Sequence, residues 1–368
     1  MKRMMEGSIA VAHVVARCRP TVIAAYPITP STHVPEELSR IQPEYGYEFI
    51  TVESEHSAMS ACIGASVAGA RTFTATSSQG LLYMHEVLFN ASGMRLPIVM
   101  VVANRSVGAP LNIWNDWQDS ISQRDAGWIQ LYCKNNQETL DTVIQAYKIA
   151  EKTDIPVMVC FEGYYLTHEV SEVDLPEQKD VDAFLPAFRP KLALDTNKPM
   201  SFGTFAPPKY YQGMREKQHR DIIASAKVIE SVAAEFSKRF KRPQRALLES
   251  YKLEGAETVF VTMGSLAETT EVAVDELRTE KKKAGLLRVK CLRPFPSEAV
   301  AKALARAKRV VVLEKDVSAG AGGVLAMDVR ASLRCDKPVV SVVCGLGGKD
   351  VPVREIKKTF DLKKDSWL

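Results

Sequence analysis

The sequence predicts an α/β protein with two doubly wound domains, each built on a mostly parallel sheet. Apolar strand-like runs alternate with helical patterns through the first half, a proline-rich stretch follows, and a second alternating pattern begins near residue 258. Continuous apolar strands separated by helices are typical of parallel sheets covered on both faces. The 368 residues suffice for two such domains.

In the first half, the predicted strands are TVIAAY (21–26), YEFITV (47–52), RTFTATS (71–77), PIVMVVA (97–103) and IPVMVCF (155–161). Helical patterns lie between them at 55–69, 79–93 and 136–152. Residues 104–135 break this rhythm with a long irregular stretch rich in Trp, Asn, Asp and Gly. Ordered loops of such length are usually functional, so this stretch is expected to serve a site.

The second half begins after a connector. From about 165 to 215 the chain holds six prolines and few apolar runs, which predicts an extended connector followed by a polar helix near 219–240. Four further strands are predicted at 258–264, 286–292, 309–314 and 337–345. We therefore divide the chain into a first domain core (1–165), a connector and linking helix belonging to that domain (166–245), and a second domain (246–368).

The composition argues against several classes of protein. The chain is 46% apolar and 25% charged, and its net charge of +4 forms no clear basic stripe, so no nucleic-acid partner is expected. No apolar stretch is long enough to span a bilayer, and a cytoplasmic location is expected. The seven cysteines are scattered without a CxxC pair, which favours buried, reduced thiols and predicts no metal centre on this chain.

Four strand-to-helix junctions of the first half carry polar side chains. The first is YPITPST (26–32), where Thr29 suits an N-cap and Pro30 the first helical position. Pro35 suits the same position, so the helix is expected either to start there or to kink there. The alternative is that the Thr29 hydroxyl faces a substrate at the carboxyl end of the strand. Composition alone favours capping.

The second junction is VESEHSA (52–58), with Ser54 as a predicted N-cap and Glu55 in the first helical turn. Glu55 either complements the helix dipole or faces a ligand. The small residues that follow at helical spacing predict a close, dry contact. Burial there would raise the pKa of the Glu55 carboxyl, so that it could donate a hydrogen bond at neutral pH.

The third junction lies within residues 74–89, where capping explains the serines and Gly80 relieves crowding. The fourth is Arg105, which follows a strand directly and is either a solvated loop residue or a bidentate clamp for a carboxylate. All four junctions fall at carboxyl ends of strands in one domain. Their side chains, including Ser78, are therefore expected to converge.

One glycine-rich segment points elsewhere and is discounted. SAGAGGVL (318–325) follows a predicted strand, but the third glycine of a dinucleotide fingerprint would fall at Leu325. A nucleotide- or flavin-binding electron-transfer protein is therefore not favoured. The chain also lacks GDG followed by a downstream Asn, the pattern that holds magnesium diphosphate in thiamine enzymes.

Taken together, the four junctions resemble the α subunit of the 2-oxoacid:ferredoxin oxidoreductases, most closely the pyruvate:ferredoxin oxidoreductases (pyruvate synthases). NIWNDWQDSISQRDAGWIQLYC (112–133), LRPFP (292–296) and GLGGKDV (345–351) add to the resemblance, which covers nearly the whole chain in order. It implies a first domain that is the pyrimidine-binding half of a thiamine diphosphate site. The second domain would resemble the C-terminal domain of transketolase.

The resemblance also implies roles for individual residues. Glu55 matches the glutamate that bonds the N1′ atom of the thiamine pyrimidine. Thr29 and Arg105 match the residues that hold the 2-oxoacid. Further cofactor contacts are implied for Ile28, Ser78, Gln79 and Gly80.

The implied reaction is the reversible oxidative decarboxylation of pyruvate to acetyl-CoA and CO₂, with electrons passed to ferredoxin. Because this chain lacks the GDG pattern and cluster-binding cysteines, the Mg²⁺ and the iron–sulfur clusters are expected on partner subunits. The resemblance implies a β subunit with the diphosphate half and iron–sulfur ligands, a ferredoxin-like δ subunit and a γ subunit. A branched-chain 2-ketoacid, 2-oxoglutarate or oxalate are alternative substrates, although the intact ITPST favours pyruvate. A non-catalytic assembly subunit is the other alternative, which the intact Glu55, Thr29 and Arg105 argue against.

Overall fold

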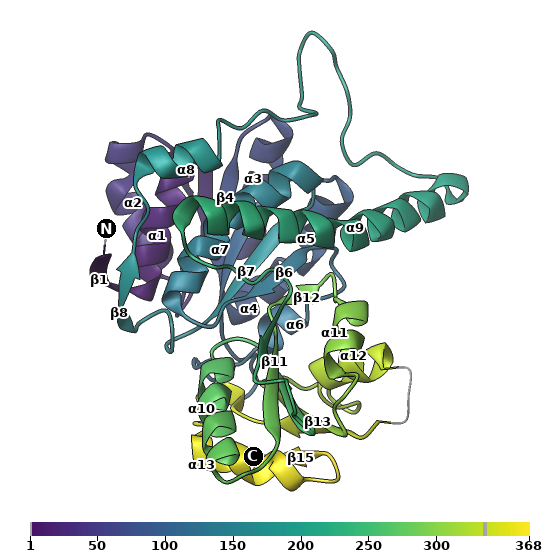
Figure 1. Ribbon diagram of the computed structural model, residues 1–368. Coiled ribbons are helices and arrows are strands. Elements are labelled where there is room, and N and C mark those ends of the chain that lie inside the picture. Colours follow the sequence, from purple (N-terminus) through teal and green to yellow (C-terminus); the bar gives the residue numbers. More distant parts are fainter. Residues whose placement is uncertain (1, 334–336) are drawn as a thin grey trace.

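The computed structural model describes residues 2–333 and 337–368, which fold around two sheets (Figure 1). In spatial order, the N-terminal sheet consists of β12 (Cys291–Arg293), β6 (Ile129–Tyr132), β7 (Val157–Glu162), β5 (Val99–Asn104), β4 (Thr72–Thr76), β2 (Val22–Ala25) and β3 (Glu48–Thr51). All of its neighbouring strands are parallel except β12, which runs antiparallel to β6. The predicted α/β class is confirmed.

Helices cover both faces of the N-terminal sheet. One face carries α1 (Gly7–Arg17), α2 (His33–Tyr45) and α7 (Asn136–Thr153), and the other carries α3 (Glu55–Val67), α4 (Ser78–Tyr83), α5 (His85–Gly93) and α6 (Gln118–Ile121). Strand β5 shows the reason for its unbroken apolar sequence. Val99 and Val101 pack with the α1 and α7 side, whereas Met100 and Val102 pack with the α3 and α5 side.

The C-terminal sheet consists of β15 (Ser366–Trp367), β14 (Val339–Val343), β13 (Arg309–Glu314), β10 (Thr258–Thr262), β11 (Ala284–Val289) and β9 (Leu248–Tyr251). Helix α10 (Leu266–Thr279) packs against α13 (Val353–Lys358), and α11 (Ser297–Leu304) packs against α12 (Val324–Ser332). Short 3₁₀ turns, η1 (Leu346–Gly348) and η2 (Thr359–Asp361), flank α13. The apolar core of this sheet is continuous with the core on the α3 and α5 side of the other.

Three predicted elements differ in detail. The predicted helix 79–93 is interrupted at Met84, which ends α4 and precedes α5. The predicted strand 286–292 is divided at Lys290, because its last residues leave the C-terminal sheet and pair with β6 of the other sheet. An apolar run cannot reveal this division, since both parts are buried. The division of the chain at residues 165 and 245 stays a prediction.

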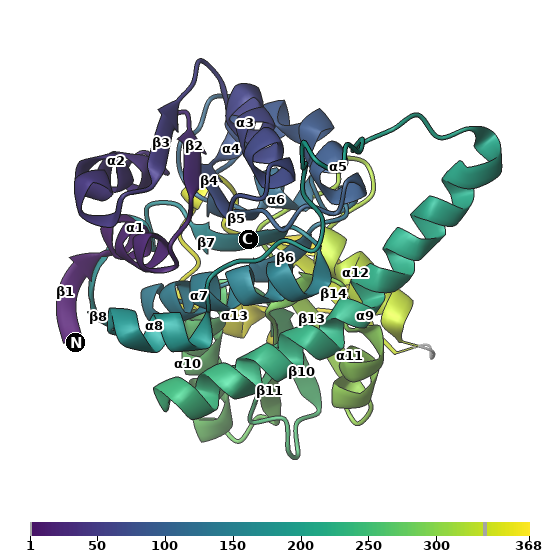
Figure 2. The same cartoon turned by 90° about the horizontal axis from the view of Figure 1, so that it is seen from above.

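The predicted connector contains more regular structure than expected. It holds β8 (Val170–Asp174), which pairs antiparallel with β1 (Lys2–Glu6), and α8 (Gln178–Phe184). The predicted helix 219–240 is the C-terminal part of α9 (Pro208–Phe240). Its last turns pack against α7, while its N-terminal half projects beyond the body of the molecule (Figures 1 and 2).

Six of the seven cysteines are buried and free, as predicted, and Cys335 lies outside the described residues. No helix in residues 2–333 and 337–368 has the length and apolar character needed to cross a bilayer. Within the same residues, no group of three or more His, Cys, Asp or Glu side chains is arranged to hold a metal ion.

A buried carboxylate joins the two sheets. Glu162 ends β7 and is 1% exposed. It accepts hydrogen bonds from the indole nitrogen of Trp117 (3.1 Å), the hydroxyl of Ser265 (2.8 Å) and the ammonium of Lys315 (2.6 Å). Because Ser265 and Lys315 follow strands of the C-terminal sheet, this cluster fixes the two sheets relative to each other.

Candidate functional site

The four predicted junctions lie side by side at one edge of the N-terminal sheet. Strands β5, β4, β2 and β3 are consecutive neighbours and parallel, so their carboxyl ends share that edge. The chain runs from β2 to its neighbour β3 and then crosses back to β4 on the other side of β2, so the strand order reverses here and this edge is a topological switch point. Ligands of open α/β sheets bind at such points. The four junctions thus share one edge of the sheet, as the sequence predicts.

The junction after β2 does not cap a helix at Thr29. Helix α2 begins at His33 with Thr32 at its N-cap, so the predictions of a start at Pro30 or Pro35 are wrong. Instead, the hydroxyl and backbone N–H of Ser31 donate to the carbonyl of Ile28, at 2.8 and 2.9 Å, and close a tight turn. Thr29 is exposed on this turn and Ile28 is partly exposed. The Thr29 side chain is thus free of a capping role.

Glu55 is buried at the start of α3, where the predicted cap is confirmed. Ser54 accepts a hydrogen bond from the backbone N–H of Ser57 at 3.2 Å. The Glu55 side chain packs on Gly80, because a Cβ atom added to Gly80 would lie 2.4 Å from the Glu55 Oε1 atom. Gly80 therefore relieves crowding, as expected, and the group it makes room for is the Glu55 carboxyl.

The carboxyl group of Glu55 has no partner of its own. No hydrogen bond or ion pair joins it to a different residue in the described part of the chain. Burial raises its pKa above the ordinary value, and only its own backbone N–H opposes that rise. Burial therefore favours the neutral, hydrogen-bond-donating form of this carboxyl group more than it is favoured in an exposed glutamate.

The junction after β4 is buried and is stabilised by hydrogen bonds to neighbouring loops. Ser77 occupies the N-cap of α4, but its hydroxyl makes no capping bond, so the capping prediction is wrong for its side chain. Ser78 is fully buried, its hydroxyl donates to the carbonyl of Ser106, and the same hydroxyl lies within hydrogen-bond distance of the Gln79 side chain. Its φ of +50° is costly for a residue with a side chain. The Gln79 side chain reaches the loop at Gly108.

Asp119 fastens two of the junctions together, and it was not among the predicted site residues. One carboxylate oxygen accepts from the backbone N–H groups of Ser78 (2.9 Å) and Arg105 (3.0 Å). The other accepts from the side chain of Asn104 (2.8 Å) and the backbone N–H of Ser120 (2.7 Å). Burial raises the pKa of Asp119 to about 6, although the four donors oppose the rise. At neutral pH it is a fixed anion between the ends of β4 and β5.

Two backbone carbonyl groups orient the guanidinium group of Arg105. Its Nη1 atom donates to the Thr29 carbonyl at 2.9 Å, and its Nε atom donates to the Asn112 carbonyl at 3.1 Å. The side chain is mostly buried, and burial lowers its pKa. No carboxylate forms an ion pair with it among the described residues. The guanidinium group therefore keeps its charge available for an anionic ligand beside Thr29, and it is not the solvated loop residue of the alternative reading.

The C-terminal part of the chain supports the loop that carries these contacts. The Asn112 side chain donates to the Gly347 carbonyl (3.1 Å), and the Gly347 N–H donates to Asp116 (3.1 Å). A Cβ atom on Gly348 would lie 2.4 Å from the Trp114 side chain. Glycines at 347 and 348 thus allow the close approach of this loop.

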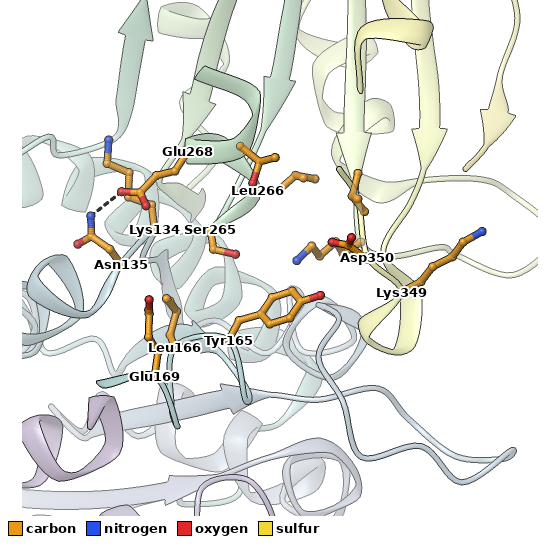
Figure 3. A pocket seen from close by; sticks show the side chains of 13 residues that line it. Lys134, Asn135, Tyr165, Leu166, Glu169, Ser265, Leu266, Glu268, Lys349 and Asp350 are labelled. Carbon is orange, nitrogen blue, oxygen red and sulfur yellow. Dashed lines mark hydrogen bonds between the residues drawn. The ribbon is translucent and has the colours of Figure 1, made fainter. Parts of the chain in front are cut away.

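A separate cleft of about 250 Å³ lies between the two sheets (Figure 3). Asn135 and Glu268 face each other across it and are joined by a hydrogen bond of 2.6 Å, and Tyr165 lies beside Leu166 on its wall. None of the residues predicted for the site lines this cleft. The edge after β5, β4, β2 and β3 therefore remains the candidate site.

Comparisons with known proteins show the family of this chain. Residues 13–234 match the family described as "Pyruvate flavodoxin/ferredoxin oxidoreductase, thiamine diP-bdg", and residues 256–356 match "Pyruvate:ferredoxin oxidoreductase core domain II". The chain is 49% identical over 362 residues to the pyruvate synthase subunit PorA of Methanocaldococcus jannaschii, covering 96% of this chain and 93% of that protein. It is 42% identical over 371 residues to the ketoisovalerate oxidoreductase subunit VorA of Pyrococcus horikoshii, covering 99% and 94%.

Two solved structures share the fold. A 2-oxoglutarate:ferredoxin oxidoreductase from Magnetococcus marinus aligns with a TM-score of 0.75 at 21% identity, covering 97% of this chain and 64% of that one. A split-gene transketolase aligns with a TM-score of 0.58 at 14% identity, covering 98% and 100%. Both likenesses support the predicted pairing of a thiamine-type and a transketolase-like α/β unit.

Asp119→Asn is expected to lower the free energy of unfolding of the full-length chain by about 2–3 kcal/mol at pH 7. The amide nitrogen would face N–H donors that the carboxylate now accepts, and they would stay buried without an acceptor. Urea unfolding followed by circular dichroism measures the change. Asp125→Asn, an exposed substitution in the same loop, serves as the control and should have little effect. Equal stabilities of the two variants would contradict the role of Asp119.

Glu55→Gln is expected to stabilise the full-length chain at neutral pH, because it removes a carboxyl group whose ionisation burial opposes. The folded-state pKa is raised above the unfolded value of about 4.3. The wild type therefore loses stability relative to the variant as pH rises from that value through the raised pKa. Unfolding free energies measured across this pH range test the sign. If the wild type instead became more stable relative to the variant as the pH rises, the raised pKa of Glu55 would be contradicted.

Proposed function

The chain belongs to the pyruvate flavodoxin/ferredoxin oxidoreductase family, and we propose that it is a subunit of an enzyme that oxidatively decarboxylates pyruvate to acetyl-CoA and CO₂ and reduces ferredoxin. One observation carries the proposal. Two side chains at the same sheet edge lack a partner among residues 2–333 and 337–368: the buried carboxyl group of Glu55 has no hydrogen-bond partner on another residue, and Arg105 has no carboxylate partner. The first suits a polar heterocycle and the second suits the carboxylate of a small acid.

The residues at this edge fit thiamine diphosphate. Its thiazolium ring supplies the nucleophilic carbon and the electron sink for decarboxylation of a 2-oxoacid. On this chain, Glu55 would donate a hydrogen bond from its neutral carboxyl to a pyrimidine nitrogen, and Gly80 leaves room for that carboxyl. Ile28 and Gln79 are proposed as further contacts. Ser78 would contact the cofactor through its backbone atoms and through packing, because its hydroxyl already donates to the Ser106 carbonyl.

The 2-oxoacid would lie against Arg105 and Thr29. Two carbonyl groups orient the Arg105 guanidinium, so little conformational entropy is lost when it binds a carboxylate. The exposed Thr29 side chain offers a neutral hydroxyl on the same turn whose carbonyl accepts from Arg105. A neutral group orients the acid without stabilising its carboxylate so strongly that loss of CO₂ is opposed.

Companion subunits would complete the enzyme. We propose that a β subunit supplies the Mg²⁺ and diphosphate half of the site together with iron–sulfur ligands, and that a ferredoxin-like δ subunit and a γ subunit complete the enzyme that passes electrons to ferredoxin. The relatives named above are themselves called subunits, which supports an assembly of several chains. CoA is the proposed acetyl acceptor, the proposed location is the cytoplasm, and no nucleic-acid partner is proposed.

A branched-chain 2-ketoacid is the second candidate substrate, because the VorA relative is 42% identical. The higher identity to the pyruvate synthase subunit (49%) favours pyruvate. The deciding experiment co-expresses the chain with its companion subunits, purifies the complex, and measures CoA-dependent viologen reduction with pyruvate, 2-ketoisovalerate, 2-oxoglutarate and oxalate. Pyruvate should give the highest kcat/KM. A complex without an iron–sulfur subunit would refute the proposal.

Glu55→Ala in this complex is expected to lower the rate of CO₂ release from pyruvate by about 100-fold or more, because the hydrogen bond that activates the cofactor is lost. Glu53→Ala is the matched control, since Glu53 is exposed two residues earlier. Radiolabelled CO₂ release gives both rates, and companion-subunit content is checked in each preparation. An unchanged rate in the Glu55 variant would show that the assignment is wrong.

A further inference from the structure

Residues 186–224 form an arm that the rest of the chain does not bury. It comprises the end of the connector and the N-terminal half of α9, and none of its residues is buried. The buried residues of α9 all lie from Ser225 onward. Figures 1 and 2 both show this half of α9 projecting away from the sheets. Among the described residues, this half meets the rest of the chain through a few contacts, such as the hydrogen bond from Gln218 to Ser92 (3.2 Å) and the ion pair of Asp221 with Arg95 (3.0 Å). Because helices in proteins are stabilised mainly by packing, a helix half left so exposed is expected to pack against another molecule.

The arm carries many exposed apolar side chains. Phe205 is 89% exposed, and the others are Leu192, Leu194, Met200, Tyr210, Tyr211, Met214 and Ile223. Beneath it, a groove of about 900 Å³ runs between the connector, α5 and the start of α9. Its apolar wall consists of Phe89, Met94, Leu192, Phe202, Tyr211 and Met214. Apolar surface gathered in this way marks an interaction site.

The arm also carries the net charge of the protein. Its seven Lys and Arg residues and three acidic residues give it +4, which equals the net charge of the whole chain. The remaining residues are therefore neutral in sum. Within the described residues, Glu216 forms an ion pair with Arg220. Asp221 forms ion pairs with Lys217 and Arg95. The basic side chains that form no ion pair there are Arg189, Lys198, Lys209 and Arg215.

We infer that the arm is the docking surface for a companion subunit whose contact surface is acidic and presents apolar side chains to the groove. This inference rests on the proposed function, which supplies the companion subunits. Aromatic, Met and Arg side chains are enriched in the centres of protein interfaces, and unpaired basic groups select an acidic partner. A second copy of this chain fits less well, because its body is neutral in sum and its arm is equally basic.

Matched substitutions on α9 test the docking surface. Met214 and Ile223 are each 56% exposed, but only Met214 lines the groove. Met214→Glu is expected to weaken binding of the companion subunits to the full-length chain by about tenfold or more, and Ile223→Glu by less than about twofold. Biolayer interferometry with the purified companion subunits gives the two Kd values. Circular dichroism verifies that both variants are folded.

A second pair of variants tests the charge. Lys209→Glu/Arg215→Glu should weaken binding more than Lys363→Glu/Lys364→Glu, which makes the same charge change on an exposed segment far from the arm in sequence. Raising the salt concentration should weaken wild-type binding and reduce the difference between the pairs. Trypsin should cut after Lys191 and Lys209 in the isolated chain, and assembly should protect both sites.

Several results would overturn the inference. One such result is an assembled complex that turns over pyruvate while trypsin still cleaves the arm. Another is companion subunits that bind Met214→Glu as tightly as the wild-type chain. Either result would refute the docking surface and leave the proposed function standing. Failure of any companion subunit to bind would refute both. Loss of self-association of the isolated chain in Met214→Glu would assign the arm to a second copy. Binding of the isolated chain to phosphatidylserine vesicles through the arm would assign it to a membrane.

Discussion

The buried carboxylate of Asp119 is the contact on which the candidate site depends. Peptide N–H groups just beyond the ends of parallel strands lack partners in the sheet, and burial makes an unpaired group costly. Asp119 accepts two such groups, from Ser78 and Arg105, and so fixes the distance between the ends of β4 and β5. Gly80, two residues beyond Ser78, then meets Glu55, and the Arg105 side chain then meets the Thr29 carbonyl. One carboxylate thereby sets the relation between the Glu55 side and the Arg105 side of the candidate site.

The C-terminal sheet contributes to the same network without supplying a predicted site residue. The loop that carries Asp119 also carries Trp117, which donates to Glu162, and Glu162 in turn binds Lys315 and Ser265. Gly347 and Gly348 lack side chains, which lets Asn112 and Trp114 of the same segment approach them closely. The C-terminal sheet and its turns thus help to hold this segment in place.

Much of this arrangement could be predicted from the sequence. Continuous apolar runs indicated the strands β2, β4, β5 and β7, and the polar junctions after parallel strands indicated the shared edge. Asp119 could not be found in this way, because its partners Ser78 and Arg105 lie 41 and 14 residues away and are backbone groups that carry no sequence signal. Its only signal was a place in a long loop rich in Asp, Asn and Trp. The start of α9 had a clearer signal, since Pro208 occupies the position that proline favours at the beginning of a helix.

The central claim is that this chain activates the cofactor through the Glu55 carboxyl, and hydrogen–deuterium exchange at C2 of bound thiamine diphosphate measures that activation directly. In the assembled complex, NMR after rapid acid quench should show exchange that is about 100-fold or more faster with wild-type chain than with Glu55→Ala, at equal cofactor occupancy. Equal exchange rates at equal occupancy would contradict the account, because the buried carboxyl would then take no part in activating the cofactor.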